Sequence, residues 1–197
     1  VLPLVLLSAN YLKHDPLVLL VAGIVGCGSS SSQASPDTTG TPASTRAGDI
    51  PDTAVYLTYH GHGYSLKYVE GWTIQLRPSA GVLINDKDSS EAVAIVPAQP
   101  SRLAAAASAD LSQLARSLPK FRLVFRRADR LPAGNAIRAQ YQTLSPRDPV
   151  TGKRVSVIVD RYYIPGPAKR AVLTLATPVG VDNVDAFRLI ARSFRWK

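Results

Sequence analysis

Two histidines with one residue between them are the clearest candidates for metal binding in this chain. His60 and His62 flank Gly61, and alternate residues of a strand project to the same side, so both imidazoles could face one ion with Asp86 or Asp88 as a further ligand. However, Gly61 also makes this segment a turn candidate, and no third ligand has a characteristic spacing. We therefore expect neither a metal ion nor a cofactor.

A second candidate chemistry is nucleophilic catalysis by serine. It needs a strained strand-to-helix turn, as in the motif G-x-S-x-G, and a base within reach. The segment Gly63-Tyr64-Ser65-Leu66-Lys67 lacks the second glycine, and His60 and His62 are the bases nearest in sequence. This pattern does not indicate a catalytic triad.

The segment Thr151-Gly152-Lys153-Arg154 is similar to the end of a phosphate-binding loop. Arg147 stands where that motif needs its first glycine, and Arg154 replaces the hydroxyl residue that would hold Mg²⁺. A surface turn explains the segment. We assign no catalytic residue and expect that the protein is not an enzyme.

Aromatic residues near the start of the folded part offer an alternative site. Tyr64, Tyr68 and Trp72 could line a cleft for a small molecule or a metal, which would make the protein a carrier. The other interpretation is that they are core and turn anchors, because large aromatic side chains dominate small cores.

Positive charge is concentrated in the second half of the chain. The net charge is +9, and residues 119–197 contain sixteen Lys or Arg against five Asp or Glu. Alternation along a predicted strand places Lys120, Arg122 and Arg126 on one face, opposite Phe121, Leu123 and Phe125. The neighbouring strand and the last helix extend the candidate anion-binding face, which consists of Lys120, Arg122, Arg126, Arg138, Arg188, Arg192 and Arg195.

An apolar run of eleven residues, 16–26, precedes the single cysteine, Cys27, and follows Lys13. It is shorter than the roughly 20 residues that span a bilayer, but it fits the apolar part of a secretory signal. Ile24-Val25-Gly26-Cys27 resembles the lipobox of bacterial lipoproteins. The resemblance implies that residues 1–26 are a signal peptide, removed before Cys27 is acylated; an uncleaved signal anchor is the alternative.

Residues 27–52 contain the predicted lipidated cysteine followed by a segment rich in Ser, Thr, Pro and Gly. This composition cannot bury enough apolar surface to fold, so we expect a disordered tether. On the scaling of flexible linkers its mean reach is roughly 25–30 Å.

Residues 53–197 form the predicted domain. Turn residues separate short alternating segments, and two segments have helical spacing of apolar residues. The segments 64–68 and 72–76 are expected to pair as a hairpin around Gly71, and Asp182 is the expected N-cap of the last helix. The expected strands are 54–59, 64–68, 72–76, 81–85, 91–96, 121–127, 136–144, 155–164 and 171–176, and the expected helices are 101–118 and 183–194, which indicates an α+β fold.

The segments 63–72, 172–178, 183–187 and 193–196 resemble the opening hairpin, last strand and closing helix of the PsbP-like family (the LpqN/PsbP superfamily). The resemblance implies an α/β/α sandwich on a central antiparallel sheet and, for most members, a binding or assembly function. Combined with the lipobox, it predicts a module held by lipid on the extracytoplasmic face of the cell membrane. There an anionic lipid, a cell-wall polymer or an acidic envelope protein is the expected partner, and nucleic acid is not.

Overall fold

Ten strands and two helices make up the part of the chain that the computed structural model describes, which is residues 47–86, 88–98 and 102–197. The predicted signal peptide, Cys27 and most of the predicted tether lie outside the described residues. Within the described ranges, no helix has the length and apolar character needed to cross a membrane.

Seven strands form one antiparallel sheet, and three form a smaller one. The order across the large sheet is β3 (Thr73–Arg77), β4 (Gly81–Asn85), β5 (Ser90–Pro97), β9 (Lys169–Pro178), β8 (Ser156–Gly166), β7 (Gly134–Leu144) and β6 (Arg122–Leu131). The order across the small sheet is β1 (Tyr56–Gly61), β2 (Tyr64–Val69) and β10 (Arg195–Trp196). All nine predicted strands are present, with ends shifted by a few residues, and β10 is an additional strand.

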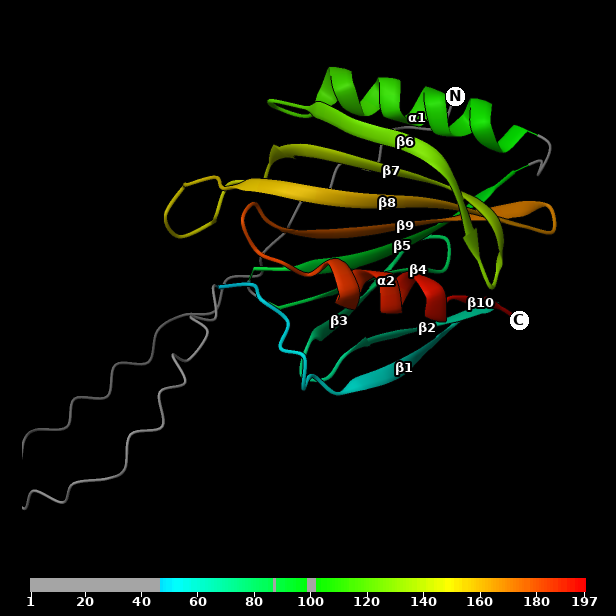
Figure 1. The fold of residues 1–197 in the computed structure, drawn as a ribbon, viewed down its shortest axis with the longest axis horizontal. Coiled ribbons are helices and arrows are strands. Elements are labelled where there is room, and N and C mark those ends of the chain that lie inside the picture. The colour runs from blue at the N-terminus through cyan, green and yellow to red at the C-terminus, as the bar shows by residue number, and fades with distance from the viewer. Residues whose placement is uncertain (1–46, 87, 99–101) are drawn as a thin grey trace, which may run out of the picture. The chain divides into compact units, whose positions relative to one another are not determined.

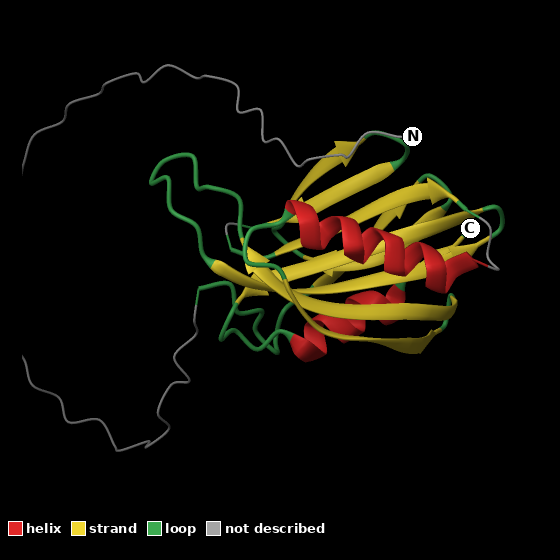
Figure 2. Ribbon diagram, turned by 90° about the horizontal axis from the view of Figure 1, so that it is seen from above, coloured by secondary structure: helices red, strands yellow, loops and turns green. Residues whose placement is uncertain are grey.

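The large sheet is the central layer, with α1 (Leu103–Ser117) on one face and α2 (Val184–Ser193) with the small sheet on the other (Figures 1 and 2). Side chains alternate between these faces, so Tyr163 packs under α1 whereas its neighbour Tyr162 packs under α2. The predicted α+β architecture, an α/β/α sandwich on an antiparallel sheet, is therefore observed.

The two cores differ in size. The larger lies between the sheet, α2 and the small sheet, where Tyr64 stacks on Phe194 with ring centroids 5.6 Å apart. Phe194 in turn contacts the ring of Trp196 edge-on at 5.1 Å. The smaller core lies under α1, where Ala107 and Leu111 pack against the sheet. Alanine-rich sequence favours α1, and its helical backbone ends before Pro119.

The predicted hairpin between residues 64–68 and 72–76 is wrong. β2 pairs with β1 and β10, whereas β3 pairs with β4 at the edge of the large sheet. Gly71 has φ of +83°, which lets the chain turn tightly, and the turn sends it from one sheet to the other. Local alternation predicted both strands but not their partners.

Residues that the sequence analysis placed in the tether belong to the folded part. Ile50 is buried in the larger core, and its N–H donates to Oδ1 of Asn183 at 2.8 Å. The carbonyl of Gly48 accepts hydrogen bonds from the side chains of Ser89 and Asn183. Asn183, rather than the predicted Asp182, is the N-cap position of α2, and its side chain fastens this segment instead of capping the helix.

Candidate functional site

The histidines and aspartates considered for metal binding do not meet. Nδ1 of His60 lies 3.0 Å from Nζ of Lys197, next to β10. Asp86 lies in the β4–β5 turn, near the opposite end of the large sheet, where its carboxylate accepts the N–H groups of Asp88 and Ser89. Among the described residues, no group of three or more potential ligands is placed to hold a metal ion.

The two loop motifs also have structural explanations. Ser65 lies within regular β2, opposite His60 in the β1–β2 pairing, and not on a strained elbow. In the segment 145–155, the carboxylate of Asp148 accepts hydrogen bonds from the N–H groups of Val150 and Thr151. Those bonds define a turn, as expected for a surface loop.

Tyr64 does not line a ligand cleft. Its side chain is fully buried, its hydroxyl donates to the carbonyl of Ala80 at 3.1 Å, and burial raises its pKa. The Tyr64 ring packs closely against Gly61, so a Cβ added at Gly61 would lie 2.4 Å from the ring. Tyr68 and Trp72 are partly buried against the same core. The prediction of a cleft is wrong for Tyr64, because stacking on Phe194 encloses its ring.

A β-bulge separates the arginines that were predicted to share one face of residues 121–127. Leu123 pairs with Tyr141 and Phe125 with Gln140, so Val124 is an extra residue without a partner on β7. The bulge reverses the alternation. Arg122 donates to Oε1 of Gln142 at 2.8 Å on the α2 side, whereas Arg126 lies on the α1 side and donates to Ser108.

Two more residues of the predicted face differ from the expectation in separate ways. Lys120 lies in the turn before β6, with φ of +52°. Arg138 forms a bidentate pair with Asp160, with atoms 2.8 and 3.1 Å apart, and its side chain is only 11% exposed. Burial lowers the pKa of Arg138, but hydrogen bonding and charge from Asp160 outweigh that effect and raise it. Its charge is therefore neutralised within the fold.

The cations at the end of α2 and in β10, which follows it, remain at the surface. Arg192 and Arg195 line a shallow groove of about 530 Å³ together with Lys67 of β2, and the other lining residues are Thr58, Leu66, Leu189 and Ser193. None of these seven residues is acidic. We call this the α2–β2 groove. The backbone N–H of Lys67 donates to the hydroxyl of Ser193 at 2.7 Å, which fixes the strand against the helix end.

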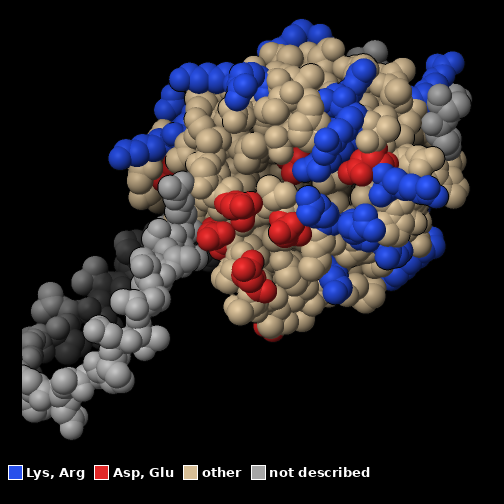
Figure 3. All heavy atoms as spheres, viewed as in Figure 1, with Lys and Arg blue, Asp and Glu red and all other residues tan. Residues whose placement is uncertain are grey.

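Charge is divided along α2. Its first turn contains Asp185, which pairs with the exposed Arg188 at 2.7 Å, and its last turn contains Arg192. The Arg195 guanidinium donates to the carbonyls of Arg192 and Phe194, at the helix C-terminus. In Figure 3 several acidic side chains gather at the lower left of the domain, with basic ones directly to their right and others along its upper edge. This arrangement complements the helix dipole.

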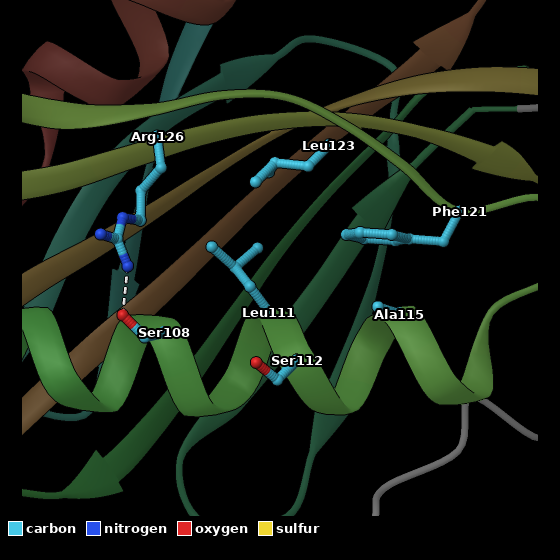
Figure 4. A pocket seen from close by; sticks show the side chains of 7 residues that line it. All are labelled: Ser108, Leu111, Ser112, Ala115, Phe121, Leu123 and Arg126. Carbon is cyan, nitrogen blue, oxygen red and sulfur yellow. Dashed lines mark hydrogen bonds between the residues drawn. The ribbon is translucent and has the colours of Figure 1, made fainter.

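A second hollow lies between α1 and the edge strand β6. Leu111 and Ala115 of α1 and Phe121 and Leu123, from the α1–β6 turn and β6, form an apolar surface, and the volume is about 250 Å³. Figure 4 shows Leu123 and Phe121 lying in the space between β6 and the helix, and Arg126 reaching across one end of the hollow to Ser108. We call this the α1–β6 pocket. Sequence reasoning missed it, because it depends on the bulge.

An ionic network joins α1 to the sheet. Oδ2 of Asp110 lies 2.9 Å from Nε of Arg161 and accepts a 2.7 Å hydrogen bond from the hydroxyl of Tyr163. Arg161 also donates to Thr174 at 2.7 Å. Burial raises the pKa of Tyr163; burial lowers that of Arg161, but Asp110 outweighs the effect and raises it. Both groups therefore keep their protons at physiological pH.

Glu91 is a buried carboxyl without a hydrogen-bond partner. It lies on β5, opposite Ile84 and Leu175, and both its oxygens are unpaired in the described residues. Burial raises its pKa well above the ordinary value. The sequence did carry a signal: Glu91 occupies an inward position of the alternation that continues with Val93.

Comparison with known proteins finds similarity to solved structures, and this similarity concerns the fold. No family model and no curated protein sequence matches the chain. The chain is similar to the solution structure of PsbP from the cyanobacterium Synechocystis, at 14% identity and a TM-score of 0.49, covering 76% of this chain and 98% of that protein.

Two further solved structures are similar to this chain. The Ran-binding protein Mog1p of Saccharomyces cerevisiae has 10% identity and a TM-score of 0.49, with 73% of this chain and 96% of that one covered. LpqN of Mycobacterium tuberculosis, described as involved in cell envelope biogenesis, has 17% identity and a TM-score of 0.43, with 73% and 91% covered. Likenesses at these values do not indicate what the present chain binds.

Proposed function

We propose that this protein is a non-enzymatic binding or assembly module, anchored by lipid on Cys27 at the extracytoplasmic face of the cell membrane, and that its α2–β2 groove binds an anionic partner. The observation that carries the proposal is the groove itself. Lys67, Arg192 and Arg195 come from three elements, β2, α2 and β10, to one hollow that no acidic side chain lines.

The location rests on the sequence around Cys27. A short apolar run ending in Ile24-Val25-Gly26-Cys27 resembles a lipobox, and acyl chains on Cys27 would hold the mature protein in the bilayer. Residues that follow provide a polar tether, so the groove has room to meet a partner near the membrane. Outside the cytoplasm, anionic lipid, cell-wall polymer and acidic protein are the available polyanions.

The anchor is tested by metabolic labelling of bacteria that express the full chain with a radioactive fatty acid. We expect label on the native chain and none on Cys27→Ser. Intact-mass measurement of membrane material should show a lipidated N-terminal cysteine. An unmodified cysteine with the preceding residues still attached would refute the anchor.

The groove is tested separately with the double variant Lys67→Gln, Arg192→Gln. Binding of the full chain to three probes is measured: vesicles with and without phosphatidylglycerol, isolated cell wall, and polyglutamate. We expect about a thirtyfold loss of affinity for one of them, because each of the two cations contributes about 1 kcal/mol near an anionic surface.

The matched control is Arg122→Gln, Arg154→Gln, which removes the same charge from exposed positions outside the groove. Binding that both double variants weaken equally would show a general charge effect and would refute the groove. Added salt should weaken binding of the native chain, since screening shortens the range of exposed charges.

A further inference from the structure

The α1–β6 pocket combines an apolar surface with a single positive charge. Leu111, Ala115 and Phe121 form part of its lining, and Leu123 is 45% exposed although it faces the helix across the pocket (Figure 4). The ring of Phe121 is supported from behind by Tyr141, with centroids 5.0 Å apart. Apolar surface left open between two elements is available for an apolar ligand.

The charge at the end of this pocket comes from Arg126. The bulge at Val124 turns Arg126 to the α1 side, where its pairing partner on β7 is the buried Ala139. Bulges commonly redirect a side chain in this way near a binding site. Without the extra residue, Arg126 would share the face of Arg122 on the other side of the sheet.

Arg126 keeps donors free for a ligand. Its guanidinium donates to the hydroxyl of Ser108, and no acidic side chain pairs with it among the described residues. A guanidinium has five N–H donors in a fixed fork that fits a carboxylate. The hydroxyl of Ser112 also lines the pocket.

We propose that the α1–β6 pocket binds a fatty carboxylate. The alkyl chain lies on Leu111, Ala115 and Leu123, and the carboxylate pairs with Arg126 and the neighbouring serine hydroxyls. The volume of about 250 Å³ is below the roughly 300–1,000 Å³ of most small-molecule sites, which favours a chain of medium length. This site is separate from the α2–β2 groove, which shares no lining residue with it.

The test is photolabelling of the full chain in membrane vesicles with a medium-chain fatty carboxylate that carries a diazirine. Peptide mapping should place the label between residues 108 and 126. Unlabelled decanoate should compete, and decanol should compete at least about tenfold more weakly, because only decanoate forms the charged hydrogen bonds.

Three variants separate the site from general hydrophobic adsorption. Arg126→Gln should reduce labelling about tenfold, whereas Arg122→Gln, on the same strand but on the other side of the sheet, should leave it unchanged. Ala115→Phe should abolish labelling by filling the pocket, and thermal unfolding should show that all three variants are folded. Equal labelling of Arg126→Gln and Arg122→Gln, label retained in Ala115→Phe, or no label at residues 108–126 would each overturn the proposal.

Discussion

The two faces of the large sheet are held to their helices by different means. Under α1, the smaller core is accompanied by the network of Asp110, Arg161 and Tyr163. Under α2 and the small sheet, contact is mainly apolar and aromatic. The buried pair of Arg138 and Asp160 on this side joins two strands of the sheet, β7 and β8, and the buried carboxyl of Glu91 has no hydrogen-bond partner among the described residues. A pair of charges thus helps to attach α1 to the sheet, whereas α2 is attached mainly by packing.

This difference bears on where charge is free to bind a ligand. On the α1 face, Arg161 is committed to Asp110, and Arg126 is the arginine that lines the hollow beside the helix. On the α2 side, the sheet arginine Arg138 is committed to Asp160, while the cations at the helix end remain in the groove. Arginines that pair with aspartates within the fold therefore alternate along the sequence with arginines that line a hollow, and only the structure distinguishes the two kinds.

The largest effect is expected from removing an aromatic contact on the α2 face. Phe194 is fully buried between Tyr64 and Trp196, so Phe194→Ala should lower the free energy of unfolding by about 3–5 kcal/mol. Urea denaturation provides the measurement. The control is Phe125→Ala: Phe125 is a partly exposed residue of the edge strand, and its loss should reduce stability far less. Equal losses would mean that the aromatic stack does not hold α2 and the small sheet.

A smaller loss is expected from breaking the ionic network on the α1 face. Asp110→Asn leaves the partly buried Arg161 without its counter-charge and should destabilise the fold by about 2–3 kcal/mol. The matched control is Asp185→Asn, which breaks an ion pair exposed on α2 and should have an effect below about 0.5 kcal/mol. Thermal unfolding of both variants tests the contrast, and a negligible effect of Asp110→Asn would show that packing alone attaches α1.

Features that depend on residues close together in the sequence could be predicted, whereas features that depend on distant residues could not. Strands and helices were predicted to within a few residues, because the period of apolar residues is a local property; α1 was expected at 101–118 and spans Leu103–Ser117. The partner of β2 could not be predicted in this way, since pairing joins distant segments. The short strand β10 was missed because two residues show no period.

The candidate site was harder to predict than the fold. The inserted residue Val124 shifts the alternation of β6 by one position. Arg122, before the bulge, and Arg126, after it, therefore lie on opposite sides of the sheet. Arg138 was assigned to a surface because its alternation is regular, but Asp160 on the neighbouring strand neutralises it. Arg192 and Arg195 do share a hollow, because α2 ends at Ser193 and the chain continues directly into β10, which pairs with β2.

The smallest change in stability is expected at Glu91, with the opposite sign. An unpartnered polar group in a core is unfavourable by about 1–2 kcal/mol, so Glu91→Leu should stabilise the fold by about that amount at neutral pH.

The pKa of Glu91 is raised in the folded state, so the folded chain holds a proton that the unfolded chain releases above pH 4.5. Native stability should therefore fall as pH rises from that value toward the raised pKa, and Glu91→Leu should remove this slope. Urea denaturation at several pH values measures both effects. Parallel pH profiles for the native chain and Glu91→Leu would show that the carboxyl is hydrated or paired, and the contrast between the two faces would then be lost.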